Sequence, residues 1–191
     1  MPKLSDMVPV STIKGLNAGL SSARETTMIS CLGSPILPLS TADTPERASP
    51  KVKALEKSVT AGHVRGTGIA PAVDSLNGLL TTAFAAIPGL EDALRGDGML
   101  VVRLRRPTSG KPSTQISNHA WGTAIDLMLD GMDPPAATGK EVPYFIAALV
   151  PFFNAAGWYS GIGFQDDMHF EVADQTILKW NQAGAFKIKG S

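Results

Sequence analysis

Residues 117–129 read SNHAWGTAIDLML and pass from a polar loop, which carries His119, into an alternating run that predicts a strand. Because successive side chains of a strand point to opposite faces, Ala124, Asp126 and Met128 are expected to share one face. Asp126 should then lie inward and near His119. This histidine and this aspartate are the first two members of a candidate site.

Two further strands are predicted. The run MLVVRLR over residues 99–105 alternates and is rich in β-branched residues, so Arg103 and Arg105 would share a face. The run HFEV over residues 169–172 is the third strand, and it begins at a second candidate ligand, His169.

Apolar residues at helical spacing predict helices between these strands. Ser49 and Pro50 supply an N-cap and a first helical position, and Asp174 is expected to cap the closing helix. Pro151 should kink or divide the third predicted helix. The predicted helices begin near residues 50, 74, 143 and 175, the second of them capped by Asp74 or Ser75.

The strands follow one another too closely for helical crossovers to separate them all, so an antiparallel sheet is expected. We predict the α+β class, with a small antiparallel sheet that carries the site and helices packed on one face. Residues 1–48 are rich in Ser, Thr and Pro and are predicted to form an irregular lead segment. Residues 49–191 are predicted to form the domain itself.

Composition excludes several classes of protein. The 17 Lys and Arg residues balance 17 Asp and Glu residues, so the basic footprint of a nucleic-acid-binding protein is missing and no nucleic acid is expected as a partner. No apolar run approaches the roughly 20 residues of a membrane-spanning helix. The single cysteine, Cys31, cannot form an internal disulfide. No secretory signal is visible, so synthesis in the cytoplasm is expected.

The chain has only three histidines, and His119 and His169 lie close to acidic residues whereas His63 does not. Two imidazoles and the carboxylate of Asp126 are a ligand set that leaves the fourth position of a tetrahedral zinc ion open, as in catalytic sites. One zinc ion is therefore the expected cofactor. It would lower the pKa of a bound water to about 7, and a nearby carboxylate would take the proton. The candidates for this base are Asp166, Asp167 and Glu171.

The segment SNHAWGTAIDL fits the pattern S-x-H-x-x-G-x-A-x-D and resembles the D-alanyl-D-alanine carboxypeptidase family of zinc peptidases, which includes VanY-like enzymes and phage endolysins. A second motif matches as DDMHFE at residues 166–171, with an acid three residues before a histidine. The resemblance covers roughly residues 65–183. It implies that the substrate is the peptide stem of bacterial peptidoglycan and that Asp166 is the general base. The implied zinc ligands are His119, Asp126 and His169.

Two departures from the family pattern bear on the reaction. Carboxypeptidases of the family usually carry Glu at the position of Asp166 and often Trp at the position of Met168. Asp resembles the endopeptidase branch, so an endopeptidase that acts as a lysin or a secreted antibacterial effector is favoured. A D,D- or L,D-carboxypeptidase that removes a terminal D-Ala is the alternative. A non-catalytic zinc-containing cell-wall-binding module is the alternative of another class, and the acid at position 166 argues against it.

The resemblance also implies an arginine over the substrate carbonyl, contributed by an upstream strand. Arg103 takes this role, because a fixed cation there would stabilise the developing oxyanion, and Arg105 is the alternative. The residues expected to contact the substrate are Ser117, Trp121 and Glu171. Half-buried packing is the usual role of aromatic side chains, and it is favoured for Trp158. Glu171 would share a face with His169, so a contact with the substrate or a place behind the metal ligands is expected, and a solvated acid at the strand edge is an equal alternative.

The choice of Asp166 over Asp167 as the base rests on the resemblance, since strand alternation would place Asp167 on the face of His169. Peptidoglycan lies outside the cytoplasm, so the protein is expected to act on the cell wall or in the periplasm after release or secretion. Secretion machinery and an immunity protein are the partners that such delivery leaves open.

Overall fold

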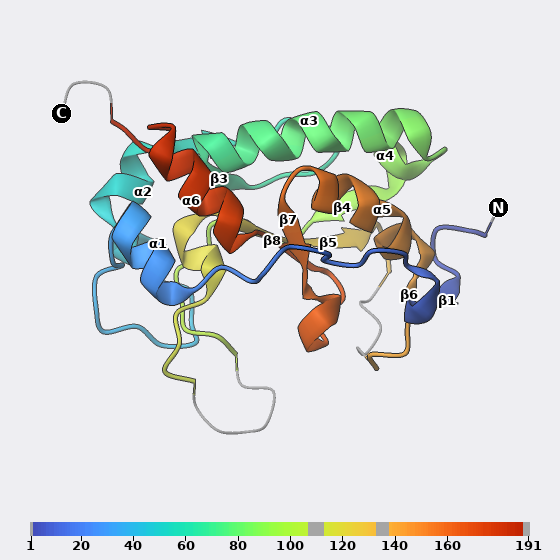
Figure 1. The fold of residues 1–191 in the computed structure, drawn as a ribbon, viewed down its shortest axis with the longest axis horizontal. Helices are drawn as coiled ribbons and strands as arrows, with labels where there is room; N and C mark the ends of the chain where they lie inside the picture. Colours follow the sequence, from blue (N-terminus) through green and yellow to red (C-terminus); the bar gives the residue numbers. More distant parts are fainter. Residues whose placement is uncertain (1, 107–112, 133–137, 189–191) are drawn as a thin grey trace.

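The computed structural model describes residues 2–106, 113–132 and 138–188 (Figure 1). At its centre is a four-stranded antiparallel sheet in the order β4-β5-β8-β7. Its strands are β4 (Leu94–Gly96), β5 (Ala124–Leu129), β7 (Trp158–Ser160) and β8 (His169–Val172). Two short antiparallel pairs flank the sheet: β1 (Met7–Pro9) with β6 (Glu141–Pro143), and β2 (Glu56–Ser58) with β3 (Thr67–Ile69).

Six α-helices and four short 3-10 helices complete the described part of the chain. The α-helices are α1 (Glu25–Leu32), α2 (Pro50–Ala54), α3 (Ala70–Ala86), α4 (Leu90–Ala93), α5 (Tyr144–Ala155) and α6 (Asp174–Gln182). The 3-10 helices are η1 (Val10–Thr12), η2 (Pro45–Arg47), η3 (Asn118–Trp121) and η4 (Gly161–Phe164). None of the described helices has both the length and the apolar character needed to cross a membrane. The predicted α+β class with a small antiparallel sheet is confirmed.

The central sheet has one apolar and one polar face, and β8 shows the difference. Phe170 stacks on Phe153 of α5, with 4.0 Å between the ring centroids. On the same side, the indole of Trp158 donates a hydrogen bond to Ser75 of α3. Helices α3 and α5 therefore cover this face, and α3 lies along it in Figure 1. His169 alternates with Phe170 along the strand and lies on the opposite face.

The structure confirms the predicted start of one helix and corrects the predicted start of another. Ser49 caps α2 as predicted, because its Oγ accepts a hydrogen bond from the N–H of Val52 at 3.2 Å. Helix α3 begins earlier than predicted, so Asp74 and Ser75 lie within the helix and neither caps it. The early start is favourable because Pro71 lies in the first turn, where its missing N–H costs nothing.

Of the two effects expected of Pro151, a kink or a division, the division does not occur. Helix α5 runs as one element through Pro151. Proline removes one backbone hydrogen bond there, and the packing of the apolar face on both sides of it keeps the helix undivided. Five side chains of this face are buried: Phe145, Ile146, Leu149, Val150 and Phe153.

Residues 99–105 do not form the expected strand. They run beside residues 115–119 and share with them one isolated bridge, between Leu104 and Ile116. The N–H of Val101 donates to the carbonyl of His119 at 3.1 Å. A regular ladder does not form because the partner segment turns into the 3-10 helix η3 instead of continuing extended. The segment nevertheless fixes the backbone of η3.

Residues 1–48 are less irregular than predicted, since they contain helix α1 and strand β1. In α1, Met28 and Leu32 are fully buried, and the thiol of Cys31 is buried beside them. A helix of eight residues is unstable by itself and depends on tertiary packing, so its own sequence pattern gives little sign of it. Helix α1 packs against α6 and η3.

One ion pair joins this segment to α6, and we predict its contribution to stability. Asp174 does not cap α6 as expected; its carboxylate accepts hydrogen bonds from the backbone N–H and the guanidinium of Arg24 at 2.8–3.1 Å. Burial alone would raise the pKa of Asp174, but the bonds from Arg24 and Thr27 outweigh it and lower the pKa. Replacing Asp174 by Asn should lower Tm by about 2–4 °C at pH 7, which corresponds to about 1 kcal/mol in a chain of this size.

The stabilisation that Asp174 contributes should depend on pH. Because the folded-state pKa of Asp174 is lowered, its contribution is complete above about pH 4, the range of the unfolded carboxyl, and is lost as the pH falls below that value. Thermal unfolding of wild type and D174N from pH 7 to pH 3 measures it. Asp130→Asn is the matched control, since Asp130 pairs with Arg95 but is 67% exposed, and it should change Tm little. A Tm difference that widens in acid would contradict the assignment.

Candidate metal centre

Three elements bring the predicted ligands together. His119 comes from η3, Asp126 from β5 and His169 from β8, and the last two are directly opposed across the antiparallel pair. Gly122 ends η3 with a φ of 63°, and a Cβ there would lie 2.9 Å from the Cα of Gly68. The glycine of the first motif is therefore needed both for the turn from η3 into β5 and for the close approach of β3.

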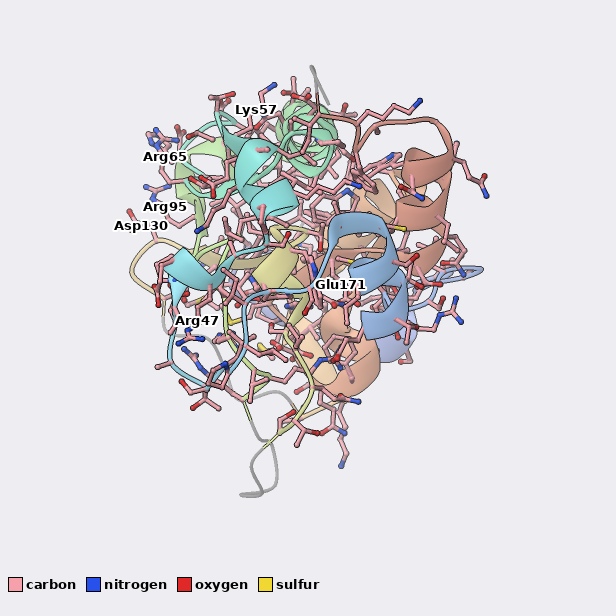
Figure 2. The ribbon with its side chains drawn as sticks, turned by 90° about the vertical axis from the view of Figure 1, so that its left-hand side faces the viewer. Arg47, Lys57, Arg65, Arg95, Asp130 and Glu171 are labelled. Carbon is pink, nitrogen blue, oxygen red and sulfur yellow. The ribbon has the colours of Figure 1, made fainter. Side chains whose placement is uncertain are left out.

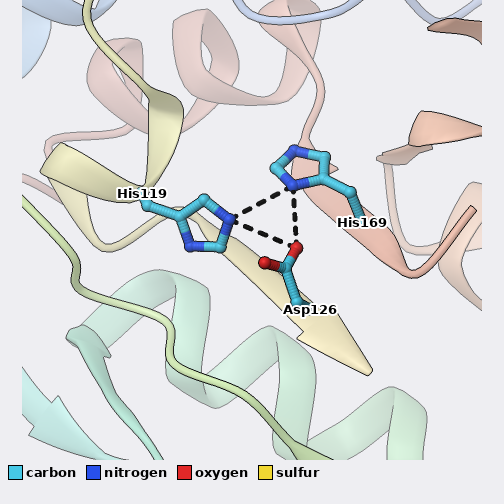
Figure 3. A group of neighbouring side chains, drawn as sticks. All are labelled: His119, Asp126 and His169. Carbon is cyan, nitrogen blue, oxygen red and sulfur yellow. Dashed lines mark hydrogen bonds and ion pairs between the residues drawn. The ribbon is translucent and has the colours of Figure 1, made fainter. Parts of the chain in front are cut away.

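The three donor atoms form a small triangle, drawn in Figure 3. The Nδ1 of His169 lies 3.0 Å from the Oδ1 of Asp126 and 3.2 Å from the Nε2 of His119, and the remaining side is 3.3 Å. Two ligands bound tetrahedrally at zinc distances are about 3.3–3.4 Å apart. Both the donor types and their separations therefore fit a zinc ion, and this candidate cluster is the set that the sequence predicted.

In each histidine, the ring nitrogen that points away from the triangle has a hydrogen-bond partner in the protein. The Nδ1 of His119 faces the carbonyl of Met99 at 3.2 Å, and the Nε2 of His169 faces the Oε2 of Glu171 at 2.9 Å. Each of these partners is an acceptor, so each of these ring nitrogens carries the proton. In the neutral form of each ring, the lone pair of the nitrogen that faces the triangle is then available to a metal, which is the usual arrangement behind histidine ligands.

Glu171 is part of the support of the site and is only 2% exposed. Figure 2 shows it inside the molecule, whereas Arg95 and Asp130 lie at the surface. Its Oε1 accepts from the backbone N–H of Ala23 at 3.1 Å, and its Oε2 accepts from the Nδ2 of Asn118 at 2.7 Å. The expected contact of Glu171 with substrate is therefore replaced by bonds inside the protein.

Sequence reasoning missed both of these supporting partners. Asn118 lies beside His119 within the first motif, and its position there was the one available sign of a role. Ala23 acts through its backbone, because its N–H binds Glu171 and its carbonyl accepts from the amide of Asn118 at 3.2 Å. A backbone contact from a distant segment leaves no pattern in the sequence.

The charges of the site reinforce one another. Burial would lower the pKa of His169, but hydrogen bonds to Asp126 and Glu171 outweigh it and raise the pKa to about 10. Burial would raise the pKa of Asp126, but the two histidines outweigh it and hold the pKa well below its usual range. Burial would also raise the pKa of Glu171, but the hydrogen bond and the charge of His169 outweigh it and lower the pKa. The carboxylates thus stabilise positive charge in the triangle.

The two acids before His169 have different surroundings. Asp166 is exposed, and its pKa is raised by partial desolvation and by Asp126, against the opposing charges of His169, His119 and Arg103. Asp167 is only 6% exposed, and its pKa is raised by burial and by Asp166. Strand alternation does not decide between them, since β8 begins at His169. Asp166 is the acid that is both exposed and electrostatically coupled to the histidines.

The two arginines expected near the substrate differ in their contacts. The Nε of Arg105 donates to the carbonyl of Ile116 at 3.4 Å. The guanidinium of Arg103 donates through Nη1 to the carbonyl of Leu104, and its buried Nε has no partner among the described residues. Burial and Arg106 lower the pKa of Arg103, while Asp126 and Asp166 raise it. Arg103 therefore lies within the electrostatic reach of the site.

The remaining residues expected to contact substrate, Trp121 and Ser117, are both largely buried. Trp121 is fully buried, and its indole donates to the carbonyl of Gly33 at 2.8 Å, so it has no surface to offer a substrate. Its bulk fills the core beneath η3. Ser117 is 6% exposed and immediately precedes η3, where its N–H donates to the carbonyl of Arg103.

The bond between Glu171 and His169 yields a prediction. Replacing Glu171 by Gln keeps the shape but removes the charge that holds the ring, so the affinity for zinc should fall about 10–100-fold. Competition with a chelating dye of known affinity measures this. Glu91→Gln, an exposed acid of α4, is the matched control and should keep the wild-type affinity. Equal zinc affinities in the E171Q and E91Q variants would show that Glu171 does not orient His169.

Comparison with known proteins identifies the segment that holds this cluster. A search of curated proteins finds no match. The family model described as D-alanyl-D-alanine carboxypeptidase matches residues 111–172, which contain His119, Asp126 and His169 together with both motifs. The match supports a peptidase, and a His-Asp-His cluster that could hold a metal agrees with it. The resemblance that the two motifs carry is thereby supported over residues 111–172, the segment that this chain shares with the D-alanyl-D-alanine carboxypeptidase family model.

Proposed function

We propose that this protein is a zinc-dependent peptidase that hydrolyses an amide bond in the peptide stem of bacterial peptidoglycan, as an endopeptidase. The observation that carries the proposal is the triangle of His119, Asp126 and His169, whose donor atoms are 3.0–3.3 Å apart beside the exposed carboxyl of Asp166. Such a substrate implies action on the cell wall or in the periplasm after release or secretion.

The chemistry divides between the metal and the chain. A zinc ion held by the three ligands would polarise the scissile carbonyl and make a water molecule acidic enough to ionise near neutral pH. Asp166 takes a proton from the attacking water and delivers it to the leaving amine, because it is the exposed acid coupled to the histidines. The guanidinium of Arg103, with one N–H unpaired within the described residues, is suited to stabilise the carbonyl oxygen as it gains charge.

A carboxypeptidase that removes a terminal D-Ala is the second candidate. The description of the matched family favours it. Asp166 favours the endopeptidase, because the carboxypeptidases that the motif resembles usually carry Glu at this position. Both candidates use the same ligands and the same base, so they differ only in where the substrate chain ends relative to the cleaved bond.

Mass spectrometry of purified muropeptides separates these candidates. The protein is incubated with them after zinc loading, with and without a chelator. Release of stem peptides or separation of cross-linked dimers is expected, and restoration of the activity by zinc after removal of the chelator would support the metal's role. Loss of one terminal D-Ala would establish the carboxypeptidase. Absence of any chelator-sensitive cleavage would overturn the proposal and favour a cell-wall-binding module.

A further inference from the structure

A pocket of about 200 Å³ is lined in part by Asp166 and Asp167, the two acids that precede His169 in the chain. Asp166 lies in its wall, so the pocket adjoins the site at which the base would act. It is formed by β5, the start of α5 and the turn before β8. The described residues that line it are Leu127, Met128, Met132, Pro143, Phe145, Ile146, Gln165, Asp166, Asp167 and Met168.

The size and the walls of the pocket indicate what it could hold. Pockets that enclose whole small molecules measure about 300–1,000 Å³, so this one has room for a single side chain. Its walls are largely aliphatic, and the three methionines among them are flexible enough to adapt to an unbranched chain. The walls alone would suit any apolar side chain.

Asp167 makes the pocket more selective. It is 6% exposed, and neither oxygen of its carboxylate has a hydrogen-bond partner among the residues that the structure describes. A buried carboxylate without a partner is costly, and it accepts hydrogen bonds but donates none when ionised. An entirely apolar occupant would leave this cost in place. An acidic occupant would be repelled by both Asp166 and Asp167.

We infer that this pocket is a specificity site for a substrate side chain with an unbranched aliphatic stem and a terminal ammonium group, which Asp167 binds. The inference rests on the proposed function for its position beside the cleaved bond. The aliphatic stem lies against the methionines and Leu127, and the ammonium group pairs with the carboxylate. Asp167 then selects the substrate, while Asp166, its neighbour, serves the reaction.

The first experiment measures binding without catalysis. The metal-free protein, labelled with ¹³C at the methionine methyl groups, is titrated with n-pentylammonium and with 1-pentanol, which has a similar length but no charge. The methyl signals of Met128, Met132 and Met168 should shift with pentylammonium, and the affinity should exceed that for pentanol about tenfold. D167N should lose this preference. Equal affinity of the wild type for the two probes would overturn the inference. This comparison uses the wild type alone, so it does not depend on whether D167N folds.

The second experiment measures cleavage of muropeptides with free amines and of the same muropeptides after chemical acetylation of those amines. The wild type should favour the free amines at least about tenfold in kcat/KM, and D167N should lose most of this preference. Asp92→Asn, an exposed acid of α4, is the matched control and should keep it.

The two failures can be told apart. If the wild type cleaves both substrates equally, the specificity site is wrong and the peptidase stands. If it cleaves neither, the proposed function fails, and the titration with pentylammonium and pentanol still decides whether the pocket binds an amine.

Discussion

Replacement of His119 by alanine is expected to remove the bound zinc, from one ion per chain to almost none, and to abolish chelator-sensitive hydrolysis of muropeptides. His119 supplies one corner of the donor triangle, and two ligands hold a metal far less well than three. A metal ion contributes several kcal/mol to the stabilisation of the transition state, so kcat/KM should fall at least about 10³-fold. Elemental analysis after dialysis and the muropeptide assay measure the two effects.

His63 provides the control for this variant, because it is a histidine that lies exposed and outside the triangle. His63→Ala should keep one zinc ion and the wild-type rate. His119 is preferred to His169 for the test, since removal of His169 would also leave the buried carboxylate of Glu171 without its charged partner. Retention of a full zinc equivalent by H119A would contradict the assigned ligand set.

Replacement of Asp166 by asparagine is expected to lower kcat about 10²–10⁴-fold while one zinc ion stays bound. The amide keeps the size of the side chain but cannot accept a proton, and general base catalysis contributes about this much. Asp166 is not a corner of the triangle, so the metal should be unaffected. Measuring kcat and zinc content on the same preparation separates a lost base from a lost ligand.

Two further variants sharpen this test. Asp166→Glu keeps the acid and should recover part of the rate, because the longer side chain still reaches the site from the same turn. Asp92→Asn changes the charge by the same amount at an exposed position of α4 and should leave kcat unchanged. A wild-type kcat in D166N would show that another group takes the proton.

The candidate cluster of His119, Asp126 and His169 was largely predictable because short-range patterns carry it. Alternation along residues 123–129 places Asp126 on the polar face, and the two motifs select His119 and His169. The antiparallel register that opposes Asp126 to His169 is not visible in either motif. It follows from a pairing between strands far apart in the chain, which only the fold supplies.

The predictions that the structure contradicts failed because they depend on contacts between distant segments. Residues 99–105 have a strand pattern, but their partner is the turn of η3, and a ladder needs two extended segments. Trp121 was expected at a surface and lies in the core, because the 3-10 turn directs it inward. Helix α1 and the bonds of Ala23 to the site were missed since they depend on long-range packing. Local pattern therefore predicts the members of the candidate cluster well and the residues that support them poorly.

The opposition of Asp126 and His169 has a consequence for assembly of the sheet. If β8 slipped by one residue along β5, His169 would turn toward α5 and Phe170 would take its place, because side chains alternate with a period of two. No donor triangle would exist in that arrangement. A metal that binds only the correctly paired form stabilises that form by mass action and does not stabilise the slipped form. A bound zinc ion would thus favour the correct register of β5 and β8 over the slipped one, in addition to any part it takes in hydrolysis.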